Sequence, residues 1–144
     1  MTTHSNLDQS WWALRLTYGL IAFLAGLDKF FNLLANWEAY LAPVIRSVVP
    51  VSAGTLMRGV GIIEMLVGIM ILTNRTRVGA YAASAWLLSI AINLLLTGSY
   101  LDVAVRDVGL AVGAWALARL TEVRQPEPAN VVARSAVRSA GAEA

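Results

Sequence analysis

The sequence predicts an all-α integral membrane protein, a bundle of four helices that cross the bilayer. Three observations lead to this prediction. Hydrophobic residues make up 58% of the 144-residue chain and charged residues only 14%, against about 25% charged residues in ordinary soluble domains. Four apolar runs each approach the roughly 20 residues that a helix needs to cross ~30 Å of hydrocarbon. A soluble domain of this size could not bury so much apolar surface.

The four apolar runs cover residues 11–34, 54–73, 78–96 and 100–120. Polar turns at residues 74–77 and 97–99 separate the last three runs. Residues 35–53, between the first and second runs, include Pro43, Pro50 and scattered polar side chains, which argue against a spanning helix. We expect a short interfacial amphipathic segment there.

The spans define the organisation of the chain and its orientation. We expect an N-terminal tail over residues 1–10, a transmembrane domain over residues 11–120 and a disordered tail over residues 121–144, where Pro, Ala, Ser and charged residues dominate. Six arginines lie either in the turn at residues 74–77 or at and after the end of the fourth run: Arg75, Arg77, Arg119, Arg124, Arg134 and Arg138. On the opposite side, only Arg46 lies in a loop. The positive-inside rule then places both termini in the cytoplasm. We expect a multi-pass protein of the inner (cytoplasmic) membrane.

Composition also excludes several function classes. The chain has no cysteine, so it can form neither disulfides nor thiolate metal sites, and it cannot carry out thiol–disulfide catalysis. The single histidine, His4, precedes the first apolar run, so no embedded histidine pair can hold a haem. We therefore expect no metal site and no internal electron carrier. The net charge of +2 does not indicate nucleic-acid binding, and the absence of a complete catalytic constellation favours a non-enzymatic role.

The charged side chains inside the apolar runs include six that lie mostly toward the outer half of the predicted bundle: Asp28, Lys29, Arg58, Glu64, Arg106 and Asp107. Each costs ~2.5–3.5 kcal/mol at the centre of a membrane helix when unpaired. The total, on the order of 15 kcal/mol, exceeds the net stability of a typical protein. We therefore expect one inward-facing network near the outer mouth of the bundle. Such a network either fixes the helices in register or forms a ligand or proton site.

Residues three or four apart lie on one face of a helix, and each run has such a face with small and polar residues. The first carries Arg15, Gly19, Ala22, Gly26 and Lys29, and the second carries Gly54, Arg58, Gly61, Glu64 and Gly68. The fourth carries Asp102, Arg106, Gly109 and Gly113. Small residues let membrane helices approach closely, so we expect these faces to meet.

Three segments resemble the DoxX-like family of small four-helix membrane proteins. Residues 15–29, RLTYGLIAFLAGLDK, have an arginine near the start and a Gly-x-x-Lys near the end. Residues 59–68, GVGIIEMLVG, place a glutamate between glycines, and residues 100–120, YLDVAVRDVGLAVGAWALARL, are similar to the family's last span. The family includes subunits of thiosulfate:quinone oxidoreductase. The resemblance implies the same fold and a quinone-linked or complex-bound role, although the Gly-Pro-Gly-rich turn that often follows the last span in DoxX members is missing here.

We therefore expect an accessory subunit of a quinone-linked membrane redox complex, with quinone as its only cofactor. The candidate ligand-binding residues are Lys29, Arg58, Glu64, Arg106 and Asp107. The basic groups can donate to quinone or anion oxygens, and Glu64 can handle a proton. The expected partners are the lipid bilayer and either other membrane subunits or further copies of the chain, and not nucleic acid. Two alternatives remain open, namely a small transporter of an anion or proton and a purely structural or assembly subunit.

Overall fold

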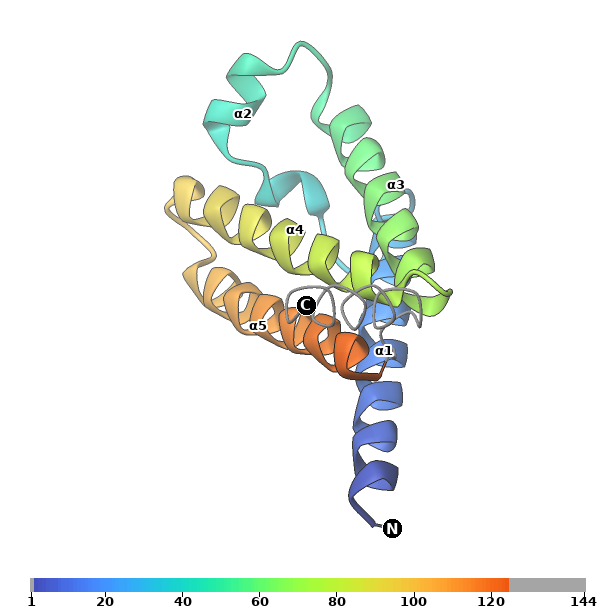
Figure 1. The fold of residues 1–144 in the computed structure, drawn as a ribbon. Coiled ribbons are helices and arrows are strands. Elements are labelled where there is room, and N and C mark those ends of the chain that lie inside the picture. The colour runs from blue at the N-terminus through green and yellow to red at the C-terminus, as the bar shows by residue number, and fades with distance from the viewer. Residues whose placement is uncertain (1, 125–144) are drawn as a thin grey trace, which may run out of the picture.

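The computed structural model describes residues 2–124, with side chains described from Asn6 onward. It contains four long helices and two short ones in the order α1 (Thr2–Asp28), η1 (Trp37–Tyr40), α2 (Pro43–Val48), α3 (Ala53–Leu72), α4 (Thr76–Thr97) and α5 (Leu101–Arg124) (Figure 1). The predicted all-α bundle of four helices, with a short segment between the first two, is confirmed. The segment comprises two separate helical turns, η1 and α2, rather than a single helix.

The ends of the helices differ from the predicted ones in three places. Helix α1 already begins at Thr2, so residues 2–10 are helical, and it ends at Asp28 rather than near residue 34. Helix α5 continues through residues 121–124, and the rest of the predicted tail, 125–144, lies outside the described residues. Helix α4 ends at Thr97, and the next residue, Gly98, adopts a left-handed conformation with φ of 67°, as is common after a helix.

Among the described residues, three segments are long and apolar enough to cross a membrane: Asn6–Asp28, Ala53–Leu72 and Thr76–Thr97. Large apolar side chains face outward, such as Ile21, Ile92 and Val112, each more than half exposed. A soluble protein rarely exposes so many contiguous apolar side chains, so the chain is a small multi-span membrane protein. Helix α5 is outside this set because six charged residues lie along its 24 positions, and its membrane crossing remains a prediction.

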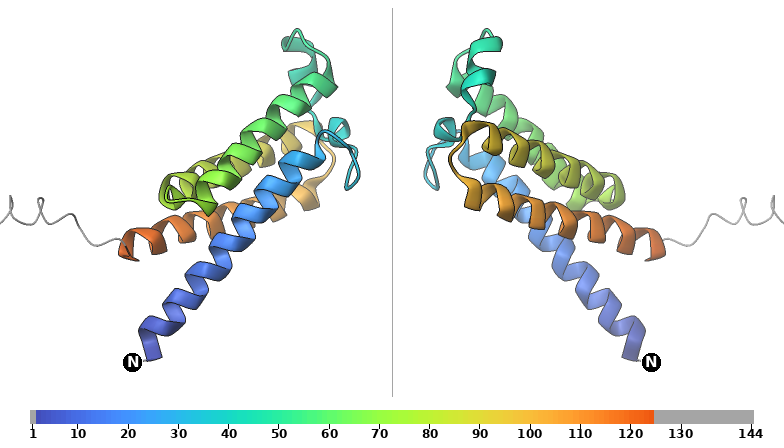
Figure 2. Two further views of the ribbon diagram at one scale, coloured as in Figure 1. Left: turned by 90° about the vertical axis from the view of Figure 1, so that its right-hand side faces the viewer. Right: turned by 90° about the vertical axis from the view of Figure 1, so that its left-hand side faces the viewer.

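The bundle is built from two closely packed pairs of helices. Helix α1 packs mainly on α3, and α4 packs mainly on α5, while contacts between α3 and α4 join the pairs. We call the end with the α3–α4 turn, the start of α1 and the end of α5 the terminal end, and the opposite end, which carries η1 and α2, the loop end. Figure 1 shows α4 and α5 side by side, and Figure 2 shows α1 extending past the other helices toward the N-terminus.

Glycines set the close approach of α1 and α3. A Cβ atom added at Gly26 would lie 2.5 Å from the carbonyl oxygen of Gly61, and one added at Gly68 would lie 2.7 Å from the carbonyl oxygen of Gly19. The predicted small-residue faces of these two helices therefore do meet. On α5 the predicted face is confirmed only at Gly113, where an added Cβ would clash with the Tyr18 side chain of α1, whereas Gly109 faces open space. Alanines form the buried face of α5 instead: Ala104, Ala111, Ala114 and Ala118.

The hydrophobic core lies toward the terminal end of the bundle. It consists of Trp11, Val67, Ile71, Ala80, Ala83, Ala114, Leu117 and Ala118. Arg15 closes this end, because its guanidinium donates hydrogen bonds to the last carbonyls of α3, at Ile71, Leu72 and Thr73, over 2.6–2.9 Å. A cation at the C-terminus of a helix also interacts favourably with the helix dipole. The hydrophobic core therefore lies toward the terminal end, whereas a mainly apolar cavity lies at the loop end.

Candidate functional site

A cavity of about 600 Å³ lies at the loop end, between the four long helices and η1. Its walls come from the second halves of α1 and α4 and the first halves of α3 and α5, and they are mainly apolar, with side chains such as Leu41, Met57 and Leu87. Ligand sites in proteins typically measure about 300–1,000 Å³ and combine apolar walls with a few polar groups. The volume and lining of this cavity fit that description.

An ion pair between Lys29 and Glu64 forms part of the cavity wall. Lys29 directly follows the last residue of α1, and Glu64 lies near the middle of α3. The distance between Lys29 Nζ and Glu64 Oε2 is 2.5 Å, and the two side chains are only 5% and 10% exposed. Each charge thus offsets the high cost of burying the other.

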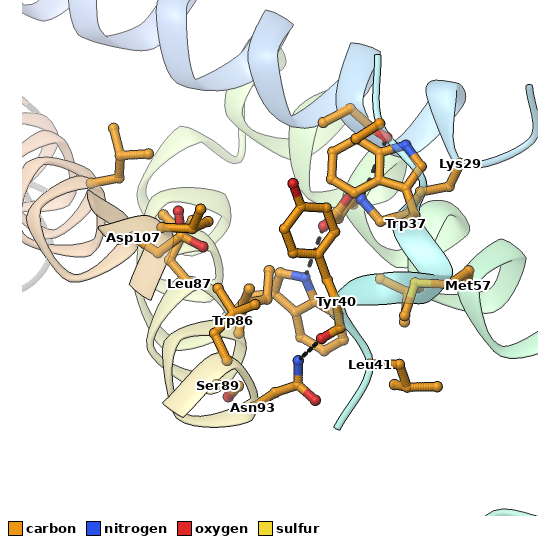
Figure 3. A pocket seen from close by; sticks show the side chains of 18 of the residues that line it. Lys29, Trp37, Tyr40, Leu41, Met57, Trp86, Leu87, Ser89, Asn93 and Asp107 are labelled. Atoms are coloured by element: carbon orange, nitrogen blue, oxygen red, sulfur yellow. Dashed lines mark hydrogen bonds and ion pairs between the residues drawn. The ribbon is translucent and has the colours of Figure 1, made fainter. Parts of the chain in front are cut away.

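Two tryptophans from different parts of the chain enclose this ion pair. The Trp37 ring, from η1, lies with its centroid 3.8 Å from Lys29 Nζ, a distance typical of a cation–π contact. Trp86, from α4, donates a hydrogen bond from Nε1 to Glu64 Oε1 over 3.4 Å. Figure 3 shows both indoles at the cavity beside the ion pair. The Lys29 ammonium is therefore contacted by η1, and the Glu64 carboxylate is contacted by α4.

Asp28 fixes the loop that carries Trp37. Its carboxylate accepts hydrogen bonds from the backbone N–H groups of Leu33 and Leu34, each over 3.0 Å, and from Trp37 Nε1 over 2.7 Å. The chain therefore turns back after α1 and places the Trp37 ring over Lys29. The expectation that Asp28 joins a common network with the other embedded charges was wrong, because its hydrogen bonds go to its own loop.

Asn93 of α4 holds the other end of η1. Its side-chain Nδ2 donates to the carbonyl of Tyr40 over 2.6 Å, and its Oδ1 accepts from the N–H of Ala42 over 3.0 Å. These hydrogen bonds join α4 to the segment at η1 rather than to another long helix (Figure 3). The segment that covers the cavity is thus tied to α1 by Asp28 and to α4 by Asn93.

A second ion pair joins Arg106 and Asp107 on α5. The distance between Arg106 Nη2 and Asp107 Oδ1 is 3.1 Å, and the Arg106 side chain is 64% exposed whereas that of Asp107 is 6% exposed. Both hydrogen bonds from Arg106 go to Oδ1. Among residues 2–124, no hydrogen bond reaches Oδ2 of Asp107. In the view of Figure 3 the Tyr40 ring lies between Asp107 and Lys29, and the residues of both ion pairs line the same cavity.

Four of the five predicted site residues therefore line this cavity: Lys29, Glu64, Arg106 and Asp107. They form two separate pairs rather than one continuous network. Arg58 is not among them, because its position on α3 leaves the side chain exposed and away from the cavity lining. Within the described part of the chain, Arg58 makes neither a hydrogen bond nor an ion pair.

Sequence reasoning missed the role of both tryptophans. Trp37 and Trp86 both contact the central ion pair, and neither is among the predicted site residues. Trp86 lies three residues before Ser89 and seven before Asn93, on one face of α4, but this spacing alone does not indicate a contact with Glu64. The position of Trp37 depends on the path of the loop after Asp28, which helical periodicity cannot predict.

The comparisons with known proteins add no relatives: no family model, curated protein or solved structure matches the chain. Among the described residues, no group of three or more His, Cys, Asp or Glu side chains is placed to hold a metal ion. The chemistry available in the cavity is thus that of an ammonium, two carboxylates, two indoles and a guanidinium at the rim. This set can bind a lipophilic ligand that has a flat polar head.

Proposed function

We propose that this chain is a DoxX-like membrane protein that serves as an accessory subunit of a quinone-linked redox complex, and that the loop-end cavity binds the quinone. The observation that supports this most is the buried Lys29–Glu64 pair between two indoles in the wall of an apolar cavity of about 600 Å³. A quinone requires apolar surface for its ring and tail and hydrogen-bond donors for its two carbonyl oxygens.

Lys29 is the donor best placed to recognise a quinone carbonyl. An ammonium group has three N–H donors; one is directed at Glu64, and a second makes only a long contact of 3.5 Å with the Ala25 carbonyl. The ammonium also faces the Trp37 ring, so a ligand oxygen would replace the distant Ala25 carbonyl as the acceptor. Glu64 lies within hydrogen-bond distance of the same ammonium, so it can receive or return the proton that accompanies quinone reduction.

The accessory role follows from what the sequence supplies. The chain has no cysteine, and its only histidine is His4, so electrons for the quinone would come from a partner subunit. Outward-facing apolar side chains on all four long helices offer surface to lipid, to such a partner or to a second copy. We further propose that the terminal end faces the bacterial cytoplasm, because Arg75, Arg77, Arg119 and Arg124 lie there.

Quinone binding can be measured directly through the tryptophans of the cavity. The purified protein in lipid nanodiscs is titrated with decylubiquinone and with menadione, and quenching of tryptophan fluorescence is followed. Lys29→Met is compared with Arg58→Met, which removes a basic side chain from the same end of the bundle but outside the cavity. We expect the parent and Arg58→Met to bind with the same Kd. Lys29→Met should bind at least about 10-fold more weakly, because a hydrogen bond from a charged group contributes about 1.5–3 kcal/mol.

Two results would contradict the proposal. One is the absence of saturable quenching by either quinone in the parent protein. The other is an equal loss of affinity in both variants, which would indicate a general effect of charge rather than recognition in the cavity. Circular dichroism of each variant establishes that the helical content is unchanged.

A further inference from the structure

A second hollow, of about 210 Å³, lies at the terminal end of the bundle, far along the helices from the quinone cavity. It lies between the start of α1, the α3–α4 turn and the end of α5, and its lining includes Trp11, Arg15, Asn74 and Arg124. Unlike the apolar loop-end cavity, this hollow is lined mainly by residues with polar groups. None of these residues takes part in the proposed quinone site.

Two arginines share one tryptophan ring in this hollow. The guanidinium carbon of Arg15 lies 4.8 Å from the centroid of the Trp11 ring, and that of Arg124 lies 4.1 Å from it. Trp11 itself is buried and is held by a hydrogen bond of 2.7 Å from Nε1 to Thr121 Oγ1. Two like charges brought together around one ring repel each other. An anion bound between them would remove this repulsion.

Both guanidinium groups keep donors in reserve. Arg15 uses Nε and Nη2 for the carbonyls at the end of α3, and Arg124 uses Nη1 for Asp8 over 2.6 Å. Within the described residues, Nη1 of Arg15, Nε and Nη2 of Arg124 and the side-chain amide of Asn74 make no hydrogen bond. Planar arginine forks and an amide are the donors that recognise phosphate oxygens.

We propose that this hollow binds the phosphate of an anionic phospholipid headgroup. The donors recognise phosphate, and two features favour a lipid as its source. Trp12 and Leu16 are exposed beside the hollow, at 48% and 46%, and such side chains suit the boundary between headgroups and acyl chains. The described part of the terminal end also carries more arginines than carboxylates. The arginines are Arg15, Arg75, Arg77, Arg119 and Arg124, and the carboxylates are Asp8 and Glu122. Basic residues beside membrane helices attract anionic lipids.

The test compares two arginines at the same end of the protein. The delipidated full chain in detergent is titrated with short-chain phosphatidylglycerol, short-chain phosphatidylcholine or inorganic phosphate, and bound ligand is counted by native mass spectrometry. Arg124→Ala removes a donor of the hollow. Arg75→Ala is the matched control, because Arg75 lies in the neighbouring turn, outside the lining, and the change in net charge is identical.

We expect the parent and Arg75→Ala to retain phosphatidylglycerol equally and in preference to phosphatidylcholine. Arg124→Ala should bind it at least about 10-fold more weakly, as expected for loss of a charge-assisted hydrogen bond. Asp8→Asn should bind it more tightly, because that change frees Arg124 from its carboxylate partner. Equal weakening in both arginine variants, or equal retention of phosphatidylcholine, would overturn the proposal. Preference for inorganic phosphate would overturn the assignment to a lipid.

Discussion

Lys29 and Glu64 form their ion pair about one helical turn from the contact of Gly26 with Gly61 between α1 and α3. The pair joins residues 35 positions apart, with Nζ and Oε2 at 2.5 Å. Gly26 and Gly61 lie three positions before them on their helices, and a Cβ added at Gly26 would come within 3.0 Å of the Glu64 Cβ. The absence of side chains at the two glycines thus brings the helices close enough for a short, buried ion pair.

Breaking this pair from one side should be more harmful than removing it entirely. Lys29→Met leaves the Glu64 carboxylate buried without its cation, and we expect a loss of about 3–5 kcal/mol in the free energy of unfolding. The double variant Lys29→Met with Glu64→Met removes both charges and should recover a large part of that loss. Unfolding in mixed detergent micelles measures both values. Additive losses in the double variant would show that the two charges do not stabilise each other.

The two glycine environments predict opposite effects for the same substitution. Gly26→Ala places a methyl group against the Gly61 carbonyl oxygen and backbone of α3, and we expect a cost of about 1–3 kcal/mol from overpacking. Gly109→Ala is the matched control, since nothing lies within 4 Å of its added Cβ. That variant should be neutral or more stable by about 0.5–1 kcal/mol, because alanine favours the helix. Thermal unfolding of the two variants side by side decides the matter, and equal destabilisation would contradict the packing described for α1 and α3.

Asp28 should control the order of the loop that covers the cavity. Asp28→Ala removes the acceptor for the N–H groups of Leu33 and Leu34 and for the Trp37 indole. Since hydrogen bonds to a charged group contribute about 1.5–3 kcal/mol each, amide hydrogen exchange at Leu33 and Leu34 should accelerate at least about 10-fold. Asp102→Ala serves as control, because Asp102 is exposed on α5. Unchanged exchange in Asp28→Ala would mean that the carboxylate does not hold the loop.

The absence of native cysteine allows the orientation to be tested by single-cysteine labelling. Asn74→Cys reports on the α3–α4 turn at the terminal end, and Ser99→Cys reports on the α4–α5 turn at the loop end. Positive-inside orientation predicts that a membrane-impermeant maleimide added to intact cells labels Ser99→Cys but not Asn74→Cys. Labelling of both positions from outside would exclude a membrane crossing between them, and labelling of Asn74→Cys alone would reverse the orientation.

Periodicity and composition were sufficient for the helices and for much of the site. Apolar runs of membrane-spanning length predicted the four long helices, and the energetic cost of buried charges predicted that the embedded charges find partners, but not that Lys29 pairs with Glu64. Both inferences depend on local spacing and on the low dielectric constant of the membrane interior. Neither requires knowledge of how the loops run.

Three features could not be read in this way. Trp37 reaches Lys29 only because Asp28 turns the loop back, which is a tertiary contact without a sequence period. Arg58 lies three residues before Gly61, a spacing that predicts the same face of α3, yet its side chain is exposed. Spacing alone does not show where the buried part of a helical face ends. In α5, alanines rather than Gly109 meet α4, because a stripe of small residues does not by itself identify which of two faces is buried.

The central claim is that a quinone binds in the loop-end cavity beside Lys29. Photo-crosslinking tests it most directly. An azidoquinone is added to the protein in nanodiscs, and the sample is irradiated. Peptide mass spectrometry then identifies the labelled residues. The account predicts saturable labelling of cavity residues such as Trp37, Met57 and Trp86, which excess unlabelled quinone prevents. Labelling confined to outward-facing residues such as Ile21 or Val112, and insensitive to competitor, would contradict it.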